Sequence, residues 1–487
     1  MGSLKTNIIS GLIWRFLERC GAQGISLVVS IILARLLSPS EFGIVALVTA
    51  ITNILMVFAE SGLGQGLIQK KDANEEDFST ALIGNIFLAI TLYTGVFVAA
   101  PVIAGFYSMS DLVLVIRVLG INILVGGMKG ILHADIQRKM QFRKFFNATI
   151  IGTIISAFVG IFMAIRGMGV WALVFQQLTN SIIDTIFLWV ASRYKFKWMF
   201  SFRRLKSLYK FSWKILASHF LDQIYTNVYS LIIGKVYTKE DLSYYNKGNG
   251  FPYYITNNLN GSIQMVMFPA LASIQDNKDR VKAAMRKSMR VSAFVVFPML
   301  AGFAAVAAEF ISILLTDKWL ACVPYLRFAC FMYALDPIHT SNLEAIKAMG
   351  RSDIYFKLEI KKKAIGILLL LAALPHGLYA MMIGRCLAGI CAGFINAYPN
   401  KKILNYGIRD QIRDLLPSFL LSIAMSACII SVSIFWNFNI YIKLIVEIFL
   451  GMLIYLAGAV FFKIAILNDI WILLKEMRRE PVNHEKG

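Results

Sequence analysis

Three charged residues, Arg15, Glu18 and Arg19, interrupt an apolar stretch near the N-terminus. Their spacing of i, i+3 and i+4 places them on one face of a helix. An ionised side chain that faces lipid costs about 2.5 to 3.5 kcal/mol on insertion scales, so such groups usually face a bundle interior or a wet cavity. We therefore expect Arg15 and Arg19 to bind an anionic substrate. An Arg15–Glu18 ion pair, or snorkelling to the interface, is the structural alternative.

Further charged residues lie inside apolar stretches later in the chain. We expect the cations Lys214 and Arg385 to contribute to the same substrate-binding site. The acids and one histidine can relay protons or bind a coupling cation, H+ or Na+; they are Glu18, Asp184, Asp222, Asp336 and His339. Structural hydrogen bonds between helices are the alternative for this second set. Pro337 is expected to break its helix and free backbone carbonyl groups.

Three more cations, Arg117, Arg327 and Lys247, lie near the outer ends of their apolar stretches. Snorkelling to the membrane surface is the default for such side chains. If they turn into a cleft instead, they can receive an anionic headgroup on its exit side. We therefore include them in the predicted cationic site.

The composition places the chain among membrane proteins. It has 487 residues, of which 58% are hydrophobic and 16% charged, and its mean hydropathy is +0.65. The net charge of +21 fits the positive-inside rule, so we expect no nucleic-acid partner. The six cysteines form no CxxC motif and have no histidine at ligand spacing, so we expect no metal site.

A bilayer core of about 30 Å needs roughly 20 apolar residues per helix, and fourteen stretches qualify. Their expected spans are residues 8 to 37, 41 to 68, 78 to 100, 112 to 133, 146 to 166, 169 to 191, 211 to 235, 245 to 272, 290 to 315, 320 to 345, 356 to 374, 377 to 398, 415 to 436 and 441 to 466. Lysine and arginine gather in alternate loops, for example at residues 193–210 and 278–290. The positive-inside rule therefore predicts a multi-pass protein of the plasma membrane with both termini in the cytoplasm.

The first half of the chain is repeated in the second. Shifting the sequence by about 200 positions aligns Ala34, Arg35, Ser38, Glu41 and Phe42 with similar residues, namely Gly234, Lys235, Thr238, Asp241 and Leu242. We therefore predict an all-α integral membrane fold with two parallel six-helix lobes, residues 1–200 and 201–402. Helices 13 and 14 and a cytoplasmic tail occupy residues 403–487. Parallel repeats are a transporter architecture with the substrate path between the halves.

Enzymatic activity is not expected. No loop between the predicted helices is longer than about 20 residues, which leaves no room for a separate catalytic domain. The chain carries no HExxH, GxSxG or Walker sequence and no paired catalytic carboxylates. The cluster Gly62-Leu63-Gly64-Gln65-Gly66 lacks the GxGxxG spacing and a preceding strand, so it indicates close helix packing. We expect no cofactor beyond a coupling ion.

Several local motifs resemble one transporter family. They are Ala34 to Gly43, Glu60 to Lys71, Phe268 to Asp276, and Asp317-Lys318-Trp319 followed by Pro324. With them the chain resembles Wzx-type polysaccharide or O-antigen flippases, the polysaccharide transporter branch of the multidrug/oligosaccharidyl-lipid/polysaccharide exporter superfamily, close to colanic-acid exporters. The resemblance implies that an undecaprenyl-pyrophosphate-linked oligosaccharide is moved from the cytoplasmic to the outer leaflet by alternating access. It implies a bacterial inner membrane, membrane lipids as surroundings, and a polysaccharide polymerase and glycosyltransferases as partners.

Transport of such a lipid is physically plausible for this chain. A cationic, wet cleft lowers the barrier that hydrocarbon presents to a diphosphate headgroup. Two alternatives stay open. One is a multidrug antiporter of the same superfamily, which would use acidic residues for cationic drugs. The other is a non-transporting scaffold of the envelope assembly machinery, which would dock glycosyltransferases on its basic loops.

Overall fold

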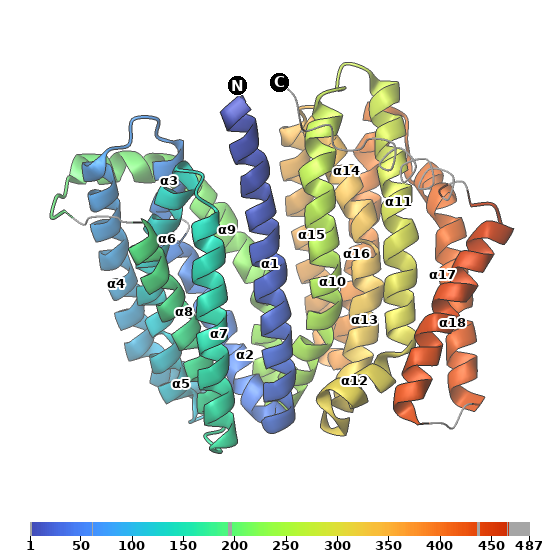
Figure 1. The fold of residues 1–487 in the computed structure, drawn as a ribbon, viewed down its shortest axis with the longest axis horizontal. Coiled ribbons are helices and arrows are strands. Elements are labelled where there is room, and N and C mark those ends of the chain that lie inside the picture. The colour runs from blue at the N-terminus through green and yellow to red at the C-terminus, as the bar shows by residue number, and fades with distance from the viewer. Residues whose placement is uncertain (1, 61, 193–196, 436–438, 465, 467–487) are drawn as a thin grey trace. The chain divides into compact units, whose positions relative to one another are not determined.

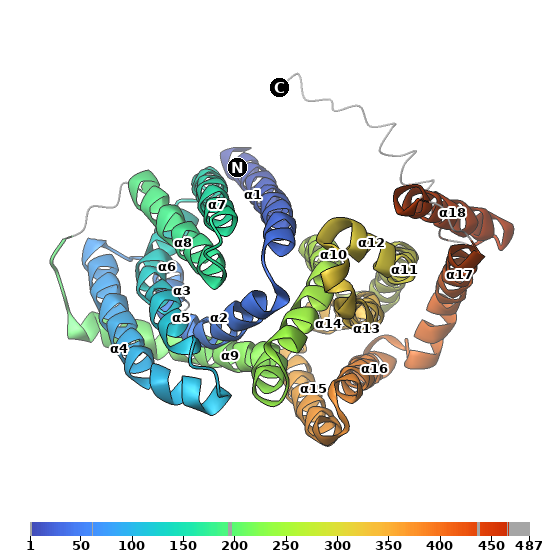
Figure 2. The same cartoon turned by 90° about the horizontal axis from the view of Figure 1, so that it is seen from below.

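The structure is a computed structural model that describes residues 2–60, 62–192, 197–435, 439–464 and 466, without the side chains of residues 2–13, 15, 16, 19, 211, 262 and 266. All regular elements within these ranges are helices. The contacts divide the chain into two compact units, Met1–Ser243 and Tyr244–Gly487. Figures 1 and 2 show the helices of both units from two directions.

In its described residues, the first unit contains nine helices and the start of a tenth. The nine are α1 (Gly2–Leu36), α2 (Pro39–Glu60), α3 (Gly62–Gln69), α4 (Glu75–Tyr107), α5 (Leu112–Leu119), α6 (Ile121–Arg138), α7 (Arg143–Ile165), α8 (Val170–Ser192) and α9 (Phe202–Val236). Helix α8 packs against both α6 and α7, and α7 also packs against α1. Helix α9 packs against α2, α3 and α4, which is why it belongs to this unit.

The second unit begins within α10 (Lys239–Ala272). It continues with α11 (Lys278–Ala305), α12 (Ala307–Leu315), η1 (Asp317–Cys322), α13 (Val323–Ala334), α14 (Asp336–Ala348), α15 (Ser352–Ala373), η2 (Leu374–His376), α16 (Leu378–Leu404), α17 (Ile408–Phe435) and α18 (Ile440–Phe461). Helix α11 is central, because it contacts α13, α14, α16 and α17. The predicted lobes, with boundaries near residues 200 and 402, were defined by the sequence repeat. The two units are defined by packing contacts, so they do not test those boundaries, which stay predictions.

Each of the fourteen predicted apolar stretches is helical over most of its described residues. In the described ranges, nine helical stretches are long and apolar enough to cross a membrane. The other five stretches, in α1, α9, α10, α13–α14 and α15, carry more polar residues. The protein is therefore an all-helical, multi-pass membrane protein, and the number of crossings stays a prediction.

Three of the expected spans are each divided into two helices within the described residues. The breaks fall between α5 and α6, between α11 and α12, and between α13 and α14. The last one confirms the break expected from Pro337, because α13 ends at Ala334 and Pro337 lies in the first turn of α14. The other two breaks have no proline at the junction, and for these the expectation of one continuous helix was wrong.

Both predicted copies begin their second helix with the same cap. The Ser38 hydroxyl donates to Glu41 Oε2 (2.9 Å), and the Thr238 hydroxyl donates to Asp241 Oδ2 (2.8 Å). In return, the Glu41 and Asp241 backbone N–H groups donate to the Ser38 and Thr238 hydroxyl oxygens. This capping box satisfies N–H groups that the first turn of a helix leaves without partners. Four of the paired residues that indicated the repeat thus have the same local role in both copies.

The starts of α2 and α10 lie against each other. A Cβ atom on Gly43 would lie 1.9 Å from the Lys239 carbonyl oxygen, so only glycine fits at this position. Because Gly43 and Lys239 lie five and one residues after the two matching caps, the repeated turns pack directly together.

Candidate functional site

A buried ion pair joins two helices of the first unit. Lys129 Nζ on α6 lies 2.7 Å from Asp184 Oδ2 on α8, and the Asp184 side chain is only 5% exposed. Asp184 was predicted as an ionisable residue within the membrane, but Lys129 was not. The pair contributes little net stability, because the desolvation of two charges offsets their attraction. Removal of Lys129 would leave the Asp184 charge buried without compensation.

Two further carboxylates surround this pair. The Thr149 hydroxyl on α7 lies 3.3 Å from Glu18 Oε1 on α1 and 3.5 Å from Asp184 Oδ1. One hydroxyl donates one hydrogen, so Thr149 can serve only one of these acceptors at a time. Glu60, at the end of α2, interacts electrostatically with Lys129. We call Glu18, Glu60, Lys129, Thr149 and Asp184 the first-unit polar cluster.

Small residues on α6 permit the approach of Glu60. A Cβ atom on Gly130 would lie 2.7 Å from the Glu60 carbonyl oxygen, and one on Gly126 would lie 3.3 Å from Glu60 Cγ. The spacing Gly126-x-x-x-Gly130 is one that lets helix backbones pack closely in membranes. The local sequence of α6 therefore positions both Lys129 and the acid that it faces.

The first-unit polar cluster contains one cation and three carboxyl groups. If all were ionised, its formal charge would be −2, which is costly among apolar helices. Protons or cations are the ligands that would neutralise it. Arg15 and Arg19 flank Glu18 in the sequence of α1, but their side chains lie outside the described residues, so the predicted cationic site around them stays a prediction.

Arg385 occupies the corresponding polar interior of the second unit. Its guanidinium donates to the Tyr245 hydroxyl and to Asn249 Oδ1 (3.2 Å), which connects α16 to α10. The Tyr333 hydroxyl on α13 also donates to Asn249 Oδ1 (3.4 Å). Tyr245, Asn249 and Arg385 border a narrow space that is otherwise lined mainly by apolar side chains. Arg385 is thus held by hydroxyl and amide groups, and a contact with substrate remains a prediction.

Asp336 and His339 lie on α14, but each has its own partner. The Asn260 amide on α10 donates to Asp336 Oδ2 (3.0 Å), and the Asn396 amide on α16 lies 3.2 Å from His339 Nδ1. These contacts are the structural hydrogen bonds considered as the alternative to ion coupling. They do not test whether Asp336 or His339 binds an ion.

Arg117 and Arg327 make equivalent contacts in the two copies. Arg117 Nε donates to the Phe97 carbonyl on α4 (3.4 Å), and Arg327 Nε donates to the Ala304 carbonyl on α11 (3.1 Å). Each arginine thereby joins the fourth predicted helix of its copy to the third. This supports a structural role for both residues and leaves a substrate contact untested.

The remaining predicted site residues do not join either cluster in the described contacts. Lys247 on α10 lies over the ring of Trp319, 5.5 Å from its centroid. Lys214 on α9 is exposed and lies 5.9 Å from the ring centroid of its neighbour Trp213. Asp222, two turns further along α9, is also exposed. Their predicted roles in binding and coupling stay untested.

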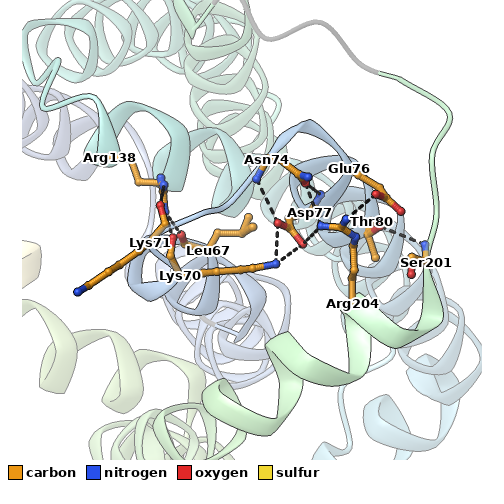
Figure 3. Close-up of polar contacts among 10 residues, drawn as sticks. All are labelled: Leu67, Lys70, Lys71, Asn74, Glu76, Asp77, Thr80, Arg138, Ser201 and Arg204. Carbon is orange, nitrogen blue, oxygen red and sulfur yellow. Dashed lines mark hydrogen bonds and ion pairs between the residues drawn. The ribbon is translucent and has the colours of Figure 1, made fainter.

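Basic residues at one end of the first unit form a second, separate cluster (Figure 3). Lys70 Nζ lies 2.7 Å from both Asp77 carboxylate oxygens, and Arg204 Nη1 on α9 lies 2.9 Å from Asp77 Oδ1. The Asp77 side chain is fully buried. Arg138 donates to three backbone carbonyl groups at the end of α3, those of Leu67, Lys70 and Lys71. Some of the basic loop residues that indicated the cytoplasmic side therefore also hold helix ends together.

The comparisons with known proteins cover most of the chain. A family model described as "Polysaccharide biosynthesis protein" matches residues 32–324. The teichuronic acid biosynthesis protein TuaB of Bacillus subtilis is 25% identical over 94% of this chain and 96% of its own length. The lipopolysaccharide biosynthesis protein WzxC of Escherichia coli is 24% identical over 86% of both chains. The succinoglycan biosynthesis transport protein ExoT of Rhizobium meliloti is 23% identical over 70% of this chain and 69% of its own.

Solved structures give the fold. The lipid II flippase MurJ in an inward closed conformation has a TM-score of 0.76 at 15% identity, over 93% of this chain and 99% of its own. A multidrug resistance transporter of the MATE family in an inward-facing conformation has a TM-score of 0.58 at 12% identity, over 80% of this chain and 95% of its own. The chain therefore has a transporter fold.

Proposed function

The chain belongs to the polysaccharide biosynthesis protein family, and we propose that it is a flippase for lipid-linked oligosaccharides. Its substrate is an undecaprenyl-pyrophosphate-linked repeat unit, which it moves from the cytoplasmic to the outer leaflet by alternating access for cell-surface polysaccharide synthesis. The relatives named for teichuronic acid, succinoglycan and lipopolysaccharide biosynthesis support this assignment. The likeness to MurJ supports it through the fold.

The observation that carries the proposal is that polar clusters occur inside the apolar bundle of each unit. Ion pairs and amide networks are costly among apolar helices, so they mark substrate or ion pathways. In the first unit, this group is the polar cluster in which Lys129 pairs with Asp184. In the second unit, it is Arg385, which donates to Tyr245 and Asn249. A pathway of this kind can accept a headgroup while the lipid tail stays in the bilayer.

The substrate headgroup is anionic, and this determines the roles of the cations. Arg15, Arg19 and Lys214 are proposed to meet the diphosphate at the cytoplasmic end of the path. Outward movement of a negative charge follows an inside-negative membrane potential, which contributes about 2.3 kcal/mol per charge per 100 mV. The acids of the first-unit polar cluster are proposed to bind H+ or Na+ as the coupling ion. The protein itself performs transport and no bond-making step.

The proposed location is the bacterial inner membrane with both termini in the cytoplasm. The basic loops support this orientation through the positive-inside rule. On the outer side, a polysaccharide polymerase would consume the flipped repeat unit. On the cytoplasmic side, glycosyltransferases would supply it.

A cation antiporter is the second candidate. The three carboxyl groups around Lys129 favour it, since buried acids suit cationic drugs, and the MATE likeness supports it through the fold. The two candidates give different deletion phenotypes. A flippase mutant accumulates one lipid-linked repeat unit and loses surface polysaccharide, whereas an antiporter mutant keeps its polysaccharide and becomes sensitive to cationic drugs.

Complementation of the deletion strain tests the proposal. The full-length gene should restore surface polysaccharide and remove the accumulated lipid intermediate, as measured by mass spectrometry of lipid extracts. Normal polysaccharide in the deletion strain would contradict a flippase. A scaffold is distinguished by reconstitution of the purified protein, because a scaffold does not move lipid in the absence of its partners.

A further inference from the structure

The two predicted copies differ in composition along the helix pair α2 and α10. Residues 244–260 of α10 contain four tyrosines and five asparagines, while the matching residues 44–60 of α2 contain no tyrosine and one asparagine. Both helices start with the same capping box, so the difference is one of side chains on a shared backbone. A difference of this size between repeated helices indicates a role that only the second copy has.

One face of α10 is occupied within its own unit. Tyr245, Asn249 and Asn260 point toward α16, α13 and α14, where they contact Arg385, Tyr333 and Asp336. These residues follow one another at near-helical spacing and form the packed face of α10. Their polarity is explained by the partners that they contact.

A stripe of exposed residues beside this packed face of α10 has a different character. Tyr253 and Tyr254 are 43% and 48% exposed, and the exposed residues that follow at helical spacing are Asn257, Gln264 and Phe268. Bare amide groups do not face hydrocarbon, because each would lose its hydrogen bonds with water. Helix α10 is also not one of the described helices that are apolar enough to cross a membrane alone. This face therefore borders water and not lipid.

An open pocket extends this face toward the end of α10. It has a volume of about 1000 Å³, partly continuous with solvent, and lies between α10, α14 and the start of α15. Gln264, Met265 and Phe268 line one side, and Lys347, Glu344 and Ser352 line the other. Lys347 Nζ lies 2.6 Å from Glu344 Oε1 and 5.7 Å from the Phe268 ring centroid.

The pocket is bordered by a stable surface ion pair. The Arg351 guanidinium donates two hydrogen bonds of 3.0 Å to the Asp353 carboxylate. These bonds lower the pKa of Asp353 to about 2, so the pair is ionised at neutral pH. The loop between α14 and α15 thus adds no net charge beside the pocket. The polar groups in the pocket lining that can contact a ligand are mainly Gln264, Ser352 and Lys347.

We propose that the exposed face of α10 from Tyr253 to Phe268, with the adjoining pocket, binds the oligosaccharide of the transported substrate. An amide group offers both a donor and an acceptor to neighbouring sugar hydroxyls. Tyrosine and phenylalanine rings offer flat apolar surfaces that pack on the C–H face of a sugar ring, and tyrosine adds a hydroxyl. This inference rests on the proposed function and assigns its glycan, as distinct from its diphosphate, to α10.

The test compares two substrates in proteoliposomes with the full-length protein. One substrate is an undecaprenyl-pyrophosphate-linked oligosaccharide, and the other carries a single sugar on the same lipid diphosphate. We expect Asn257→Leu/Gln264→Leu to slow the oligosaccharide by about tenfold or more, which is the loss of about 1.4 kcal/mol of hydrogen bonding. The single-sugar lipid should be slowed by no more than about threefold, because it forms fewer of these contacts.

Both side chains are exposed, and exposed positions tolerate most substitutions, so this variant should keep its thermal stability in detergent. A second variant and its control test the tyrosine hydroxyl groups, because replacing tyrosine with phenylalanine removes the hydroxyl and keeps the ring. Tyr253→Phe/Tyr254→Phe should slow the oligosaccharide, while Tyr441→Phe, which removes an exposed hydroxyl from α18, should not.

Each outcome decides the proposal. Wild-type rates with both substrates in Asn257→Leu/Gln264→Leu, or equal losses with both, would overturn glycan binding by α10 and leave the flippase assignment intact. Failure of the wild-type protein to move either lipid would overturn the flippase assignment and this inference together.

Discussion

At the scale of single residues, Lys129 is the side chain with the largest expected effect. Among the side chains that the structure describes, Lys129 is the cation of the first-unit polar cluster, and it pairs directly with Asp184. It illustrates how a buried charge in a membrane protein is held by helices distant in sequence.

Lys129→Met should lower the free energy of unfolding by about 3 to 5 kcal/mol, because it leaves Asp184 buried without a counter-charge. Thermal unfolding of the purified protein in detergent would measure the change. Lys129→Arg should retain most of the stability. The control Lys197→Met removes an exposed partner of Glu75 and should cost less than about 1 kcal/mol. Equal stability of Lys129→Met and the wild type would show that the pair is not formed.

The sequence revealed charged groups on the cluster helices but not their partners. Glu18 and Asp184 stood out, because an acid in an apolar stretch is rare. Lys129 lies near the inner end of its stretch, where lysine usually snorkels, so nothing local distinguished it. Its partner is 55 positions away on another helix, and such a contact depends on tertiary packing, which periodicity does not encode.

At the scale of elements, the repeated caps and the turns beside them were predictable, while the helix breaks were not. The capping box is a local pattern, so Ser38–Glu41 and Thr238–Asp241 could be recognised from the sequence. The break at Pro337 was recognised for the same reason. The junction between α5 and α6 has no proline, and the one glycine there, Gly120, is a weaker signal that the sequence prediction did not use.

The packing of the two repeated turns gives an element-scale prediction. Gly43→Ala should destabilise the protein by about 1 to 3 kcal/mol or more, because the added methyl group overlaps the Lys239 carbonyl. Gly95→Ala on α4 is the matched control, since a Cβ atom there meets nothing within 4 Å. That change should be neutral or slightly stabilising. If both variants unfold at the same temperature, the close contact between the starts of α2 and α10 does not exist.

The end of α4 gives a second element-scale prediction. Asp77→Asn removes the charge that Lys70 and Arg204 share (Figure 3), so it should detach the start of α9 from α4 and lower stability by about 3 kcal/mol. Asp353→Asn, which affects an exposed pair with Arg351, should leave the stability close to that of the wild type. Protease cleavage near residue 204 would report the detachment, and unchanged cleavage in Asp77→Asn would argue against this tether.

At the scale of the whole molecule, two copies of one helical pattern have diverged in polarity. The first unit concentrates buried acids around Lys129, and the second concentrates tyrosine and amide groups on α10. In the proposed function, the acids of the first unit bind the coupling ion, and the tyrosine and amide groups of α10 bind the glycan. The fold class and the repeat were predictable because they depend on composition and periodicity. The exposed residues of α10 were not, because which side chains stay exposed depends on how the helix packs against α13, α14 and α16.

The most direct test of the account is lipid translocation by the purified full-length protein in liposomes. An undecaprenyl-pyrophosphate-linked oligosaccharide is incorporated in both leaflets, and an impermeant glycosidase is then added outside. The flippase account predicts that nearly all of the oligosaccharide becomes cleavable with time in proteoliposomes, while about half stays protected in protein-free liposomes, as random insertion dictates. Protection of the same half in both preparations would contradict the account.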